Sequence, residues 1–115
     1  MLLIAPVTAM AEIHNAAGSY ALEAWCTQVF NTGDGVQMDI YQVEQGRRKK
    51  VYDRYFDAGR CAEDRDWIPV HVPLGFSPGQ GSRIEIVASA GPQGDLVGDW
   101  LALSSVRLTP EKGAR

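Results

Sequence analysis

The side chains best suited to binding chemistry are tryptophans that directly follow acidic residues. Asp66 precedes Trp67, and Asp99 precedes Trp100, each at the expected start of a strand. An indole ring offers a face for stacking, and carboxylates accept hydrogen bonds from sugar hydroxyls. If the two strands run parallel, these four residues meet at one rim and form a candidate ligand-binding site. In the interpretation that we favour, Asp99 caps a turn and Trp100, like Trp67 and Trp25, supplies apolar area to the core.

Catalytic residue types occur without the spacing that catalysis needs. There is no G-x-S-x-G, and Ser104-Ser105 falls within an expected strand. His14 and His71 lack the H-x-x-x-H spacing of a metal hydrolase. The segment Gly79-Gln80-Gly81-Ser82 lacks the phosphate-loop pattern and precedes a strand, so we interpret it as a tight turn. We therefore expect no catalytic site and no cofactor.

Calcium is the metal that the sequence comes closest to supporting. Asp34 lies in a glycine-rich turn, and the segment 63–66 is acidic. Ca²⁺ needs about six to eight oxygen ligands, and the D-x-[DN]-x-[DN]-G pattern is absent. We expect Asp64 and Asp66 to belong to a solvated loop or to bond nearby backbone, which leaves a structural calcium unsupported.

The charge balance bears on the partner. The formal net charge is -3 and the pI is about 5.2, which argues against nucleic acid because phosphate binding needs a basic field. We interpret the basic run Arg47-Arg48-Lys49-Lys50 as a solvated hairpin arm that discourages pairing at a sheet edge. No apolar stretch reaches the ~20 residues of a membrane span, so we expect no direct membrane insertion by this chain.

Apolar and polar residues alternate in several short runs, the pattern of half-buried β-strands. Ala21–Phe30 has mixed preferences and is assigned to a strand, because no helix cap precedes it. Trp100–Leu108 carries so few charges that we expect both of its faces to be covered. The alternation predicts a set of inward-facing residues: Met38, Ile68, Val70, Val72, Ile84 and Ile86.

Prolines indicate where one sheet ends. Pro69 and Pro73 fall on the polar parity of the run Trp67–Leu74, so both withhold an N–H from the same side of that strand. A strand with one side lacking donors suits a sheet edge.

The two cysteines differ in their surroundings. Cys26 shares parity with Leu22 and Ala24, which predicts a core position, whereas Cys61 lies in a polar loop. A disulfide requires Cα atoms within about 7 Å of each other. We favour two free thiols, and a bridge is the alternative.

The length of 115 residues suits one domain, which we assign to residues 1–110, with 111–115 as a flexible tail. Residues 1–11 end in an A-x-A pattern like that of a signal peptide. They lack a basic residue, and Pro6 interrupts the apolar run, so we favour a first strand. A strand that starts almost at Met1 is typical of a domain excised from a longer chain.

Short strands separated by Gly/Pro turns predict an all-β fold, a two-sheet antiparallel β-sandwich. The order of segments also resembles a recurring bacterial module, the galactose-binding-like jelly roll attached to membrane glycosyltransferases, sulfatases and other cell-envelope proteins. The similarity covers about residues 12–108. The matching segments are Gly33-Asp34-Gly35-Val36, Asp64-Arg65-Asp66-Trp67, Val70–Leu74, Pro78-Gly79-Gln80, Arg83–Ile86, Gly91–Asp95 and Gly98-Asp99-Trp100.

The chain departs from that module at two places, with Pro73 where Asp is usual and His14-Asn15 where His-Pro is usual. The resemblance implies a jelly-roll fold, an extracytoplasmic location and a non-catalytic accessory role in glycan or cell-envelope recognition. The alternative is a structural or docking subunit that packs against a larger membrane-protein or protein complex, and a small enzyme is the weakest option. An exposed tryptophan flanked by charged residues on a concave face would favour glycan binding, and a broad apolar patch would favour docking.

Overall fold

The computed structural model describes residues 2–4, 7–28, 35–58, 60–79, 81–90 and 100–111, without the side chains of Ile4, Arg65, Ala90 and Trp100. Asp34, the expected turn at residues 91–95 and the tail at 112–115 lie outside these ranges.

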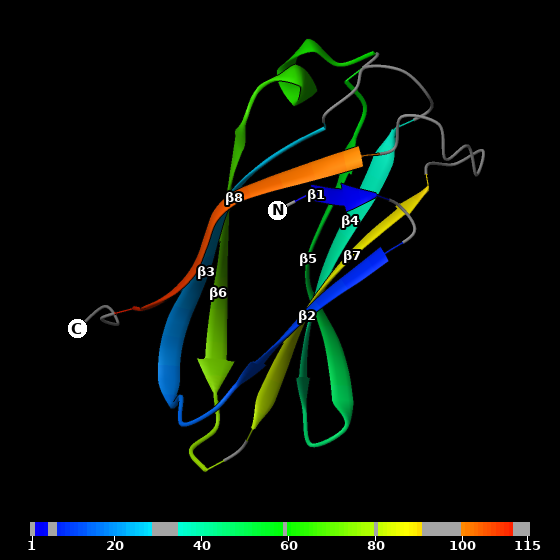
Figure 1. The fold of residues 1–115 in the computed structure, drawn as a ribbon. Helices are drawn as coiled ribbons and strands as arrows, with labels where there is room; N and C mark the ends of the chain where they lie inside the picture. The colour runs from blue at the N-terminus through cyan, green and yellow to red at the C-terminus, as the bar shows by residue number, and fades with distance from the viewer. Residues whose placement is uncertain are drawn as a thin grey trace.

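Two four-stranded antiparallel sheets face each other in the described part of the chain (Figure 1). Sheet A has the order β1 (Leu2–Ile4), β8 (Trp100–Pro110), β3 (Gly18–Gln28) and β6 (Ile68–Phe76). Sheet B has the order β2 (Val7–Ile13), β7 (Ser82–Ala90), β4 (Val36–Glu44) and β5 (Arg47–Phe56). A 3-10 turn, η1 (Ala62–Arg65), leads into β6. The predicted all-β sandwich is confirmed, and no described helix has the length and apolar character to cross a membrane.

The core lies between the inner faces of the two sheets. Cys26 of sheet A and Met38 and Phe56 of sheet B have no exposed surface. Burial of each such apolar side chain contributes about 1.5–3 kcal/mol relative to exposure. The predicted inward set is confirmed, with Ile68 partly buried at the margin of the core and the others fully buried: Met38, Val70, Val72, Ile84 and Ile86.

The two sequence features that were predicted to hinder strand pairing, the prolines and the basic run, both lie in outer strands of the sheets. β6 is the outer strand of sheet A, with the exposed Pro69 opposite Trp25 and the exposed Pro73 opposite Ala21. β5 is the outer strand of sheet B, and its basic run at residues 47–50 is exposed. These edges are therefore poor templates for further strand pairing, because one lacks donors and the other is densely charged.

The hairpin that joins β4 to β5 turns at Gln45 and Gly46, whose φ angles are 52° and 74°. Two consecutive residues with positive φ are characteristic of a type I′ turn, whose twist matches that of the flanking strands. The turn sets the register of Glu44 opposite Arg47.

The expectation that β8 is covered on both faces is wrong. Its inner residues Leu101 and Leu103 are buried, but residues 104–107 are exposed. β1 pairs only with residues 100–102 of β8, and no described element covers the outer face of sheet A. The strand has few charges because uncharged serines, Ser104 and Ser105, occupy exposed positions in it. The low charge is therefore not a sign of a second packed layer.

Candidate functional site

We had expected Trp25 in the core. It lies instead on the outer face of sheet A. Its neighbours Ala24 and Cys26 point inward and are buried, so the alternation of β3 turns Trp25 outward, where 47% of its surface is exposed. The run Ala21–Cys26 is apolar on both parities apart from Glu23. The sequence therefore does not reveal which face of this strand is covered.

Trp67 is also outside the core, with 49% of its surface exposed. It directly precedes β6 and shares the parity of Pro69 and His71 on the outer face. Because Trp25 pairs with Pro69, Trp67 is the diagonal neighbour of Trp25. Diagonal positions are about 7–8 Å apart, within reach of aromatic side chains. Two half-exposed indoles thus share one face.

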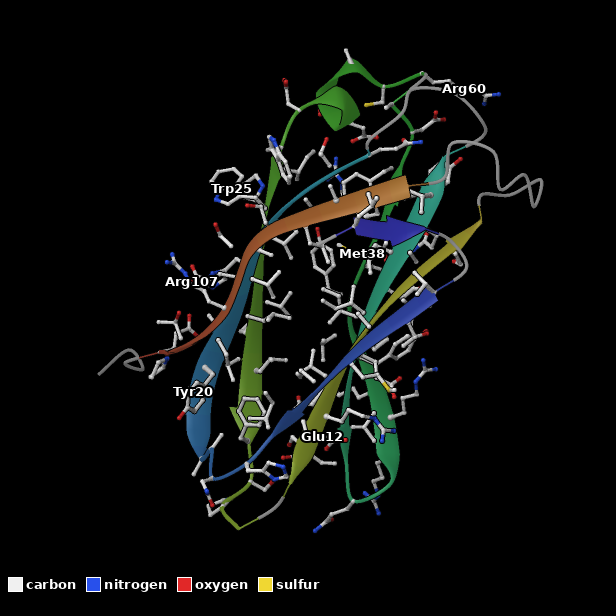
Figure 2. The ribbon with its side chains drawn as sticks, viewed as in Figure 1. Glu12, Tyr20, Trp25, Met38, Arg60 and Arg107 are labelled. Carbon is white, nitrogen blue, oxygen red and sulfur yellow. The ribbon has the colours of Figure 1, made fainter. Side chains whose placement is uncertain are left out.

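A hollow of about 260 Å³ adjoins Trp25 on this outer face. Figure 2 shows Trp25 and Arg107 on the side of sheet A that faces away from sheet B. Three strands contribute to the hollow, so its shape depends on their order in the sheet. The lining side chains include Glu23 and Trp25 from β3, Pro69 and His71 from β6, and Ser105 and Arg107 from β8.

Charged groups in the hollow contact one another loosely. Glu23 Oε2 lies 3.4 Å from His71 Nδ1, and Glu23 Oε1 lies 3.6 Å from Arg107 Nε. His71 Nε2 is 3.4 Å from Glu111 Oε2. These separations exceed the usual 2.7–3.2 Å of a good hydrogen bond, so the groups keep donor and acceptor capacity for a ligand.

A β-bulge shapes the β8 side of the hollow. Glu23 pairs with Arg107 but Trp25 pairs with Ser104, so Ala24 opposes both Ser105 and Val106. Ser105 has a φ of 56°, in the left-handed region that non-glycine residues rarely occupy. Bulges and strained residues are frequent beside binding sites, where they redirect side chains.

The structure describes only part of the predicted rim, which consists of Asp66, Trp67, Asp99 and Trp100. β6 and β8 are both antiparallel to β3, so they run parallel to each other, and Cys26 pairs with Ile68 on one side and Leu103 on the other. Asp66 and Trp67 are exposed at the start of β6. Asp99 and the side chain of Trp100 lie outside the described residues, and the rim site stays a prediction.

The acidic segment before β6 has a structural role at Asp64. This carboxylate is buried and accepts hydrogen bonds from Arg54 Nη2 at 2.7 Å and from the backbone N–H of Asp57 at 2.8 Å. The expectation of a bond to nearby backbone is therefore met at Asp64, and Asp66 is exposed as expected for a solvated loop. Among the described residues, no group of three His, Cys, Asp or Glu side chains could hold a metal ion.

Both cysteines are free thiols, and the predicted core position of Cys26 is confirmed. Burial raises the pKa of the Cys26 thiol to about 12. Only the thiolate is an effective nucleophile, so Cys26 is inert near neutral pH. Cys61 is partly exposed in the loop before η1.

The residues of the hollow cannot be recognised as a group from the sequence. Its residues are separated by more than 80 positions along the chain, from Glu23 to Arg107. Strand parity alone indicates that His71 and Pro69 lie on the same face of their strand. That signal does not say which strand lies beside β6.

The described part of the chain is thus a two-sheet antiparallel sandwich, with a hollow of mixed polar and apolar lining beside Trp25 on one outer face. No protein-family model matches the chain, and no solved structure matches it significantly. An uncharacterized protein of Archaeoglobus fulgidus is 31% identical over 68 residues, which cover 59% of this chain and 17% of that protein. The matched segment is therefore a small part of a much longer relative.

Proposed function

We propose that this chain is a non-catalytic module that binds glycans on the outer face of sheet A. The observation that carries the proposal is Trp25, half exposed in a hollow that is also lined by the polar side chains of Glu23, His71, Ser105 and Arg107. A half-exposed indole offers a ligand a flat apolar face for stacking and an N–H that can donate a hydrogen bond.

The chemistry of the hollow matches that of a sugar. The flat indole of Trp25 stacks against the C–H face of a pyranose ring. Glu23 accepts hydrogen bonds from hydroxyl groups, Arg107 donates them, and Ser105 does either. A hollow of about 260 Å³ is slightly below the usual range for small-molecule pockets, and it suits one or two sugar units at an open surface.

Two observations support an accessory module of the galactose-binding-like jelly-roll type. The two packed four-stranded sheets, with the orders β1-β8-β3-β6 and β2-β7-β4-β5, fit the eight strands expected of a jelly roll. The archaeal relative is much longer than the shared segment, as expected for a module within a larger protein. We extend the proposal to a cell-envelope, extracytoplasmic setting on the basis of the resemblance.

A docking role is the second candidate, because four exposed apolar residues lie on sheet A or directly before one of its strands: Leu2, Trp25, Trp67 and Val106. Such residues can pack against a protein surface. Glu23, His71 and Arg107, which are interspersed with Trp25, favour a polar ligand over a dry protein contact.

The test is a glycan array probed with the purified chain, followed by calorimetric titration of the retained oligosaccharide. We expect Trp25→Ala to weaken binding at least about tenfold, the scale of one lost aromatic stacking contact of ~1.4 kcal/mol. Because Trp25 is half exposed, its removal should leave the urea midpoint close to that of the unchanged chain.

Leu2→Ala is the matched control, since it removes an apolar side chain of similar exposure, 48%, from β1 of the same sheet and outside the hollow. Separate Trp67→Ala and Trp100→Ala variants test whether the rim takes part. The proposal fails if the array retains no glycan, or if Leu2→Ala weakens binding as much as Trp25→Ala does.

A further inference from the structure

β2 presents a long strand edge with no partner among the described residues. It is the outer strand of sheet B and pairs with β7 in unbroken register, from Val7 opposite Ala88 to Ile13 opposite Ser82. Thr8, Met10, Ala11 and Glu12 are exposed. An open edge of this length is a template for an additional strand.

Every other edge in the described part of the molecule carries a feature that hinders pairing. β5 has its basic run and β6 its two prolines. β1 is only three residues long, and the free second half of β8 contains the bulge at Ser105 and ends at Pro110. β2 has no proline, no bulge and no basic residue, and Glu12 is its single charge. Among the described edges, β2 is therefore the one best suited to accept a further strand.

An apolar groove of about 340 Å³ runs beside this edge, between β2 and β8. Three consecutive residues of each strand line the groove, 9–11 of β2 and 106–108 of β8. Consecutive residues of a strand point to opposite faces of the sheet. A groove that contacts three in a row therefore extends beyond the inner faces to the edges of both strands. Ala11 has the inward parity of its partner Ile84 yet is exposed, because the groove opens there. In Figure 1 the second half of β8 bends away from β1 and β2.

We propose that the occupant of this edge is β2 of a second copy, paired antiparallel about a two-fold axis at Met10. In this register Met10 faces its own counterpart, Val7 faces Ile13, and Ala9 faces Ala11. Thr8 faces Glu12, so the only charged residue of the strand meets a hydroxyl and not its own copy. Like charges directly opposite each other are unfavourable, and this register avoids them.

The pairing would join two copies of sheet B into one continuous sheet. An added strand lies about 4.8 Å beyond β2, and its inward side chains would lie over the mouth of the apolar groove. A single strand pair with its flanking contacts is a small interface compared with the ~1,600 Å² of a typical stable complex. We therefore expect a dimer with a dissociation constant on the order of micromolar.

Sedimentation equilibrium over a range of protein concentrations tests the association, and two lysine substitutions test its register. Met10→Lys places like charges opposite each other and should weaken the dimer at least about tenfold. Thr8→Lys adds the same charge to the same edge but faces Glu12 of the second copy, so it should leave the dimer unchanged or strengthen it. Equal weakening by both variants would overturn the register.

Oxidative cross-linking gives a second readout in a Cys61→Ser background. In the proposed register the Met10 Cα atoms of two copies lie about 4.5–5.5 Å apart, within disulfide range, whereas the Thr8 Cα atoms are about 13 Å apart. Met10→Cys should form a cross-linked dimer and Thr8→Cys should not. A chain that stays monomeric at all concentrations, with no cross-link at position 10, overturns the proposal.

Discussion

Trp25 and Cys26 are adjacent residues with opposite environments. The thiol of Cys26 has no exposed surface, while 47% of the Trp25 surface is exposed. A strand that served only to stabilise the sandwich would gain more from the reverse arrangement, because an indole buries far more apolar area than a thiol. The exposed position of the larger ring is consistent with a role in binding.

The two thiols should differ sharply in reactivity. We expect iodoacetamide to modify Cys61 in the native protein and to leave Cys26 unmodified, because burial excludes the reagent and raises the pKa of this thiol to about 12. In urea both should react. Intact mass measured after each treatment checks this. Two adducts forming at similar rates without denaturant would contradict the buried position of Cys26.

The two halves of strand β8 have different pairing partners. Its first residues pair with both β1 and β3, whereas its second half pairs with β3 alone after the bulge. The bulge places Ser105 in the hollow beside Trp25 and interrupts an otherwise open edge. One irregularity thus shapes the candidate binding face and limits unwanted strand pairing.

The strain at Ser105 can be measured directly. Its φ of 56° favours glycine, so Ser105→Gly should raise the free energy of unfolding by about 0.5–1 kcal/mol. Ser105→Val should lower it by about 1–2 kcal/mol, because a β-branched side chain tolerates this conformation poorly. Urea unfolding of both variants checks the signs. A stabilising effect of valine would show that the bulge is remodelled.

At the scale of the whole molecule, carboxylates on sheet B tie strands together. Glu85 of β7 lies 2.9 Å from Arg48 Nε and 2.9 Å from Arg83 Nε, and the hydrogen bond from Arg48 holds its pKa below the usual range. Ser82 Oγ donates to Glu44 Oε2 at 2.6 Å and, with the Ser77 N–H, lowers the pKa of Glu44. These bonds link β4, β5 and β7.

Stability should therefore decline in acid. A carboxyl whose folded-state pKa is depressed stabilises the fold fully above the ordinary value of 4.5, and that contribution is lost as the pH falls through the folded-state pKa. We expect the urea midpoint to be flat from about pH 7 to 6 and to fall below about pH 4.5. Glu85→Gln should flatten this decline, whereas Glu63→Gln, at an exposed position of η1, should not. An unchanged decline in Glu85→Gln would exclude Glu85 as a contributor.

The alternation of residue types was sufficient to determine the fold class and most of the core. A strand with one covered face needs an apolar residue at every second position, so Val70, Val72, Ile84 and Ile86 could be assigned without knowing their neighbours. The edge positions of β5 and β6 were also predictable, because prolines and clustered charges act against strand pairing wherever the strand lies. These features depend on a residue and its own strand alone.

Tertiary structure alone decided the candidate site and the open edge. Glu23, His71 and Arg107 meet because β3 lies between β6 and β8, and that order results from the pairing of the whole chain. Whether Trp25 faces the core or water depended on which parity of an apolar strand faced the second sheet. The groove beside β2 exists because β1 pairs with only three residues of β8 before the chain crosses to sheet B. Such long-range relations are set by the packing of all strands together, and no local pattern in the sequence encodes them.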